Sequence, residues 1–170
     1  MYVPFSKLPD HARVWIYQSN KFIEPAQRLI LERELLAFTS TWAAHGKSLE
    51  ASFSILEDHF VVLAVDENQN GASGCSIDLS THTIKHLEEL TGIDFFDRGL
   101  IPFEINGQVT QIRIQELKEK FNSGELSEDS VTFNILADTI DSLRHMWRIP
   151  ASKSWIKRYI GPKTFDSITG

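Results

Sequence analysis

The residues best suited to bind a ligand or react with one lie in a glycine-bracketed loop, residues 71–76. This loop holds the only cysteine of the chain. The loop follows a run of apolar residues and precedes a helical pattern. At a helix start the main-chain N–H groups and the positive end of the helix dipole face outward, which suits a bound anion. We therefore predict an anion or small-molecule site formed by Gly71, Ser73, Gly74, Cys75 and Ser76.

Three acidic residues flank this loop. Asp66 and Glu67 end the apolar run, and Asp78 follows within the helical pattern. Carboxylates in such places can bind magnesium or act as acid and base. We predict that the three shape the rim of the ligand site, with solvated strand and helix ends as the alternative.

Cys75 is the candidate catalytic residue. A helix N-terminus favours the thiolate form of a cysteine, which is the nucleophile. His59, His82 or His86 could serve as its base, although no spacing in the sequence singles one out. The alternative is a small buried apolar residue without chemistry.

His82 and His86 are four residues apart and follow Asp78 by four and eight, so all three fall on one stretch of helix surface. Two histidines at this spacing can chelate a metal. A solvated helix face is the commoner use of such residues. We predict no metal site, and His82 and His86 are the alternative.

Two short segments resemble parts of a nucleotide site. Gly46-Lys47-Ser48 has the end of a Walker A motif, and residues 63–67 have the shape of a Walker B. Thr41 stands where the first glycine of the motif belongs. The lysine also follows a predicted helix instead of a strand, so we expect a helix C-cap at Gly46 and no ATPase activity.

The elements that position these residues predict an α+β protein with a mostly antiparallel sheet. Apolar alternation and turn residues indicate two strand hairpins, and the second turns at Asn106-Gly107. The order allows a ferredoxin-like βαββαβ core followed by C-terminal helices. We predict strands over 13–18, 49–56, 60–65, 101–105 and 108–112, with helices over 25–44, 80–90 and 134–147; the fully apolar strand 60–65 should be central.

The helix predicted over 25–44 carries two apolar stripes. One stripe holds Leu31, Leu35, Phe38 and Trp42, and the other holds Leu29, Leu36 and Ala43. We favour a helix sandwiched inside the fold. A second stripe that binds a protein partner or forms a homodimer is the alternative.

Length and charge restrict the class of protein. The 170 residues predict a single domain, with an arm over 1–11 and a loose tail over 161–170. The net charge of −6 and the pI near 5.5 argue against nucleic-acid binding. One cysteine cannot form an internal disulfide, and no segment is apolar enough to enter a membrane. We predict a cytoplasmic protein.

Most of the chain resembles a family of small uncharacterised proteins, chiefly from Bacteroidetes, that are often labelled "ABC transporter ATPase". The resemblance rests on residues 42–47, 60–67, 74–78 and 94–98, with Phe133-Asn134 and Ser154-Trp155. It implies no established activity. We predict a ligand-binding or regulatory domain; the alternatives are a protein-interaction module and a Cys75-dependent enzyme.

Overall fold

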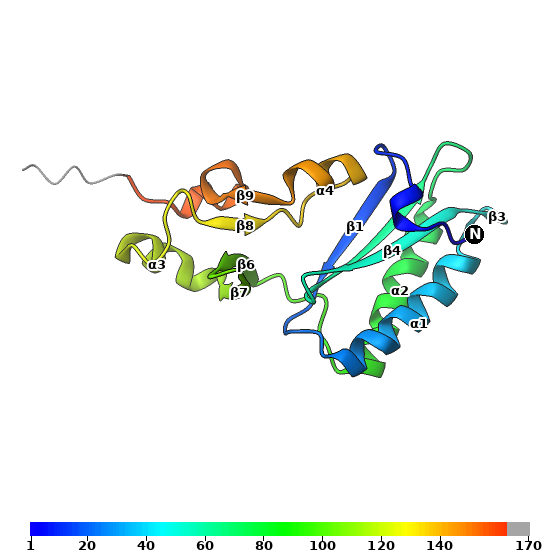
Figure 1. Cartoon of the computed structure of the whole chain (residues 1–170), viewed down its shortest axis with the longest axis horizontal. Helices are drawn as coiled ribbons and strands as arrows, with labels where there is room; N and C mark the ends of the chain where they lie inside the picture. The colour runs from blue at the N-terminus through cyan, green and yellow to red at the C-terminus, as the bar shows by residue number, and fades with distance from the viewer. Residues whose placement is uncertain (163–170) are drawn as a thin grey trace, which may run out of the picture. The chain divides into compact units, whose positions relative to one another are not determined.

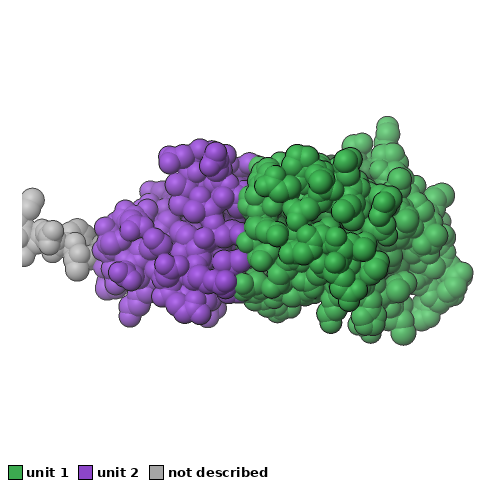
Figure 2. Space-filling view, turned by 90° about the horizontal axis from the view of Figure 1, so that it is seen from below, with its two compact units in different colours: residues 1–98, 134–147 green, residues 99–133, 148–170 purple. Residues whose placement is uncertain are grey.

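The computed structural model describes residues 1–162, which form two compact units (Figure 2). Unit 1 holds residues 1–98 and 134–147, and unit 2 holds residues 99–133 and 148 onward. The single domain predicted over 1–170 stays a prediction. The predicted tail lies outside the described residues from 163 onward. No described helix has the length and apolar character needed to cross a bilayer.

Unit 1 is built on a three-stranded antiparallel sheet of order β1-β5-β4. Its strands are β1 (Arg13–Gln18), β4 (Glu50–Leu56) and β5 (Phe60–Asp66). The predicted central position of the apolar strand is confirmed, because β5 lies between the other two and residues 60–65 are all buried. A short loop with Glu57 and Asp58 at positive φ joins β4 to β5.

Two helices, α1 (Pro25–Thr41) and α2 (Gly74–Thr91), lie side by side on one face of this sheet (Figure 1). The first apolar stripe of α1 faces inward as predicted, since Leu31, Leu35 and Trp42 are fully buried. They share one core cluster with Leu63 of β5 and Ile84 of α2. Burial of such side chains is the main force that holds helices on a sheet.

The helix C-cap predicted at Gly46 is wrong. The helix ends at Thr41. Trp42 has an extended backbone, and its ring is buried in the core. Residues 43–44 (β2) and 47–48 (β3) then form a minimal hairpin. His45 and Gly46 make its turn, both with positive φ as a two-residue hairpin loop requires.

The α+β class is confirmed, and apart from the β2–β3 hairpin the elements β1, α1, β4, β5 and α2 follow the ferredoxin-like order. The strand after α2 departs from it, because residues 100–105 pair in unit 2 and not with β1. The free edge of β1 is met instead by residues 138–139. The Val14 N–H donates to the Asp138 carbonyl at 2.9 Å, and Arg13 bridges Thr139.

This pairing also explains why the helix predicted over 134–147 is short. Only α4 (Ile140–Met146) is helical. Residues 134–137 form a turn and residues 138–139 lie along β1, and the Thr139 hydroxyl accepts from the Ser142 N–H as the helix cap. Trp147 follows the helix and packs edge-on against Phe60 of β5 at 4.9 Å.

Unit 2 is a four-stranded sheet of order β7-β6-β8-β9 with its own core around Ile101, Phe103 and Leu117. The predicted hairpin is confirmed, with Asn106 and Gly107 at positive φ. Its elements are β6 (Leu100–Ile105), β7 (Gln108–Arg113), α3 (Leu117–Ser123), β8 (Val131–Phe133) and β9 (Arg148–Pro150), with short 3-10 turns at 114–116, 151–153 and 155–159.

Candidate functional site

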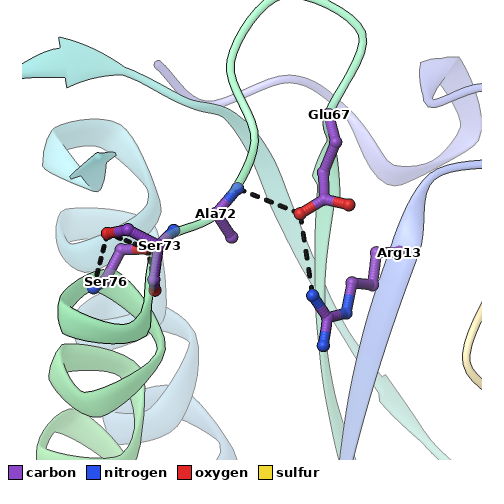
Figure 3. A network of polar contacts seen from close by, with 5 residues as sticks. All are labelled: Arg13, Glu67, Ala72, Ser73 and Ser76. Atoms are coloured by element: carbon purple, nitrogen blue, oxygen red, sulfur yellow. Dashed lines mark hydrogen bonds and ion pairs between the residues drawn. The ribbon is translucent and has the colours of Figure 1, made fainter. Parts of the chain in front are cut away.

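The loop between β5 and α2 is closed by one of the carboxylates predicted for its rim. The Glu67 carboxylate accepts the Ala72 N–H at 2.9 Å and lies 3.8 Å from the Arg13 guanidinium (Figure 3). Glu67 therefore takes one main-chain donor of the loop, the Ala72 N–H, that an external anion could otherwise bind. Asp66 is also engaged, by the Asn68 N–H at 3.0 Å and the His11 ring at 3.2 Å.

The two serines of the predicted site cap the helix. The Ser73 hydroxyl accepts the Ser76 N–H at 3.2 Å, and the Ser76 hydroxyl accepts the Ser73 N–H at 2.7 Å (Figure 3). This reciprocal capping box is a common device for starting a helix. It leaves the N–H groups of Gly74 and Cys75 as the first-turn donors without an acceptor inside residues 1–162.

The other predicted site residues do not converge. Gly71, Cys75 and Asp78 are each exposed to solvent. Cys75 is therefore not the buried residue of the alternative, and whether it does chemistry stays a prediction. No histidine among the described residues lies within hydrogen-bond distance of its thiol, and His59 is held elsewhere, at 2.9 Å from the Glu57 carbonyl. The anion site and the catalytic cysteine stay predictions with fewer free donors than the sequence suggested.

His82 and His86 lie exposed on α2, as the helical spacing requires. His86 sits 3.6 Å from the Glu89 carboxylate. Over residues 1–162 no group of three histidine, cysteine or acidic side chains is placed to hold a metal ion.

The second apolar stripe of α1 contradicts the sandwiched helix. Leu29 and Leu36 are 69% and 45% exposed, and Ala43 has left the helix for β2. The helix packs on the sheet and on α2 through its first stripe alone. The two exposed leucines are seven residues, or about two turns, apart, so they lie on one face of α1.

Beside this stripe runs the outer edge of β4, which sequence reasoning did not single out. Ala51 directs its main-chain groups away from β5, because it bonds Met1 and Val3 at 3.0 and 2.8 Å. Groups alternate along an antiparallel strand, so Phe53 and Ile55 also direct their N–H and C=O outward. Nothing within residues 1–162 pairs with those four groups.

The stripe and the edge enclose one shallow groove, which we call the α1–β4 face. It has a volume of about 600 Å³, and it is lined by Tyr2, Arg28, Leu29, Glu32, Arg33, Leu36, Phe53, Ser54 and Ile55. The sequence signal for its strand side is weak but real. Residues 51–55 of β4 contain none of the proline or charged residues with which proteins protect free edges.

The charged side chains of the α1–β4 face differ in how firmly they are held. Arg28 bonds Glu32 at 2.9 Å and Asp58 at 2.5 Å. Partial burial lowers the pKa of Arg28, but these two carboxylates outweigh it and raise that pKa overall. Arg33 is 71% exposed in its side chain and contacts only its neighbour Glu34 among the described acidic groups.

Comparison of the chain with protein-family models, curated proteins and solved structures gives no match. The predicted family resemblance therefore stays a prediction, and function is argued from the geometry of the chain.

Proposed function

We propose that this chain is a protein-interaction module that takes an extended polypeptide segment as an added strand on the α1–β4 face. The observation that carries the proposal is the outward N–H and C=O groups of Phe53 and Ile55, free beside two exposed leucines. Strand addition satisfies such groups with main-chain partners, and neighbouring apolar side chains then select the segment.

Hydrogen bonds and apolar burial can both contribute to binding at this face, whereas an apolar patch alone offers only burial. Each new main-chain hydrogen bond contributes about 1 kcal/mol net, and four outward groups are available. Full burial of a leucine side chain contributes about 1.5–3 kcal/mol, and Leu29 and Leu36 both have exposed area to lose. Together these terms can offset the entropy of ordering a short segment.

The chain itself shows that this edge accepts extended backbone. Residues 1–3 lie along the start of β4 in parallel orientation, with Tyr2 bridging Ala51. The Tyr2 ring then rests 6.1 Å from the Phe53 ring. After Val3 the arm forms a 3-10 turn at Phe5–Lys7, which still contacts β4 but makes no main-chain hydrogen bond to Phe53 or Ile55.

The test is selection of ten-residue peptides displayed on phage, against the full chain immobilised so sparsely that copies do not meet. We expect enriched peptides with alternating apolar residues. Phe53→Pro removes one outward N–H without touching the bonds to β5, and Leu36→Glu places a charge in the groove. Both should abolish binding of the enriched peptides.

Leu79→Glu is the matched control, because Leu79 is 48% exposed on α2 and does not line the groove. It should leave binding unchanged. Failure to enrich any peptide, or equal binding by the wild-type chain and Leu36→Glu, would contradict the proposed function.

A further inference from the structure

We infer that the segment received by β4 is the β4 strand of a second copy of this chain, so that two copies form a twofold-symmetric dimer with one continuous sheet. The inference rests on the proposed function, because it names the partner of the same face. Twofold dimers are the commonest soluble oligomers, and they require a surface that is complementary to itself. Two independent parts of the α1–β4 face meet that requirement.

The first part is the strand edge. Its free groups belong to Phe53 and Ile55, which are symmetric about Ser54. In an antiparallel pair centred on Ser54, Phe53 of one copy lies opposite Ile55 of the other. Such a pair exchanges two N–H···O=C bonds, and symmetry repeats the exchange. Every free outward group at these positions in both copies is then satisfied.

The second part is the helix. The midpoint of Leu29 and Leu36 in the sequence is also the midpoint of Glu32 and Arg33. When two α1 helices cross antiparallel about that midpoint, Leu29 of one copy meets Leu36 of the other. Glu32 then faces Arg33 of the other copy, so leucine meets leucine and each acid meets a base.

Both centres of symmetry belong to the same place on the molecule. Ser54, Glu32 and Arg33 line one groove, so a single twofold axis can pass beside all three. Glu32 bonds Arg28 and Arg33 bonds Glu34 within one copy, but the side chains of Glu32 and Arg33 are 42% and 71% exposed, so both can also be reached by a second copy. A strand from an unrelated protein would match the edge without any reason to match the order of leucines and charges on α1.

The register can be tested by crosslinking. At the centre of the strand pair the two Ser54 residues form a non-hydrogen-bonded pair, with Cα atoms about 4.5 Å apart. That separation suits a disulfide. Full-length Ser54→Cys in a Cys75→Ser background should therefore become a covalent dimer when oxidised by copper phenanthroline.

The matched control is Glu50→Cys in the same background. Position 50 lies on the same strand and strand face, four residues from the axis. Its two copies would be roughly 26 Å apart at about 3.3 Å per residue, so no crosslink should form. Equal crosslinking of both variants, or none at Ser54→Cys, would overturn the inference.

The charge pairing can be tested by sedimentation velocity of the full chain. We expect a species of twice the 19.4 kDa chain mass, and a monomer for Leu36→Glu. Arg33→Glu sets like charges opposite each other and should weaken association by about tenfold or more. The double exchange Glu32→Arg with Arg33→Glu restores opposite charges and should recover affinity to within about threefold of wild type.

The two proposals fail in distinguishable ways. A chain that enriches peptides but sediments as a monomer at about 100 μM overturns this inference and leaves the proposed function standing. At that concentration a dimer with a Kd in the micromolar range would be mostly assembled. A dimer that the double exchange fails to restore overturns the α1 pairing. A chain that binds neither a peptide nor its own copy overturns both proposals.

Discussion

The loop at residues 66–78 and the α1–β4 face differ in how many of their polar groups already have hydrogen-bond partners within the chain. In the loop, Glu67, Ser73 and Ser76 bond to the chain itself. On the α1–β4 face, the outward groups of Phe53 and Ile55 have no partner within residues 1–162. The loop keeps two main-chain donors without an acceptor in that range, at Gly74 and Cys75, whereas the face keeps two donors and two acceptors beside exposed leucines. Unsatisfied capacity is the better guide, because a group already paired gains little from a ligand.

Because of this difference, substitutions in the two regions should affect different properties, stability in one and association in the other. Substitutions in the loop should lower the stability of unit 1 without changing association. Substitutions on the α1–β4 face should change association with little loss of stability.

The largest effect should come from Trp42, which serves both regions. It is fully buried at the end of α1, and its indole N–H donates to the Ser76 carbonyl at 2.9 Å. Trp42→Ala should lower the free energy of unfolding by about 3–5 kcal/mol through the cavity and the lost bond. Urea unfolding followed by circular dichroism measures this; a loss below about 1 kcal/mol would refute the shared role.

Ser73→Ala should lower the free energy of unfolding by about 1 kcal/mol, because it removes the hydroxyl that caps α2. Sedimentation of this variant should match that of wild type. Ser73→Asp, which retains a capping oxygen, is the control and should recover most of the loss. A variant that dissociates while keeping its stability would move the interaction surface to the loop.

Leu29→Lys should show the opposite pattern. The side chain is exposed on the α1–β4 face, so the free energy of unfolding measured on the dilute monomer should change by less than about 0.5 kcal/mol. Association should be lost. If unfolding is clearly destabilised in the dilute monomer, Leu29 is packed within its own chain and the comparison breaks down.

The smallest effect concerns Glu88, a second carboxylate that accepts a main-chain N–H, here from Phe95 at 3.0 Å. Burial raises the pKa of Glu88 above its usual 4.5; the Phe95 bond opposes this rise, and nearby Asp94 adds to it. Its folded pKa thus exceeds the unfolded one, so its contribution to stability is complete below the unfolded pKa and is lost as the pH rises through the folded pKa.

Glu88→Gln should remove that pH dependence while keeping an acceptor for the Phe95 N–H. We expect a gain at pH 7 of no more than about 0.5 kcal/mol, and a flatter stability curve between pH 4 and 7, as measured by urea unfolding at several pH values. A steeper curve for the variant would contradict the assigned direction.

Much of the fold of both units could be predicted because its signals are local. The apolar run of β5, the inward stripe of α1 and the hairpin at Asn106-Gly107 depend on residues close in sequence. The candidate site was predicted less well. The glycines and serines at 71–76 indicated a helix start, but the partner that closes the loop, Glu67, could not be assigned from spacing.

The sequence by itself determined the α+β class, the central strand and the existence of a second apolar stripe on α1, since periodicity and turn residues act over a few positions. Only the tertiary structure decided which strand edge stays open. Residues 138–139 pair with the edge of β1, whereas the arm makes main-chain hydrogen bonds to β4 only at Ala51. The two bridges join positions 49 and 126 residues apart, and the sequence pattern of neither partner specifies the other.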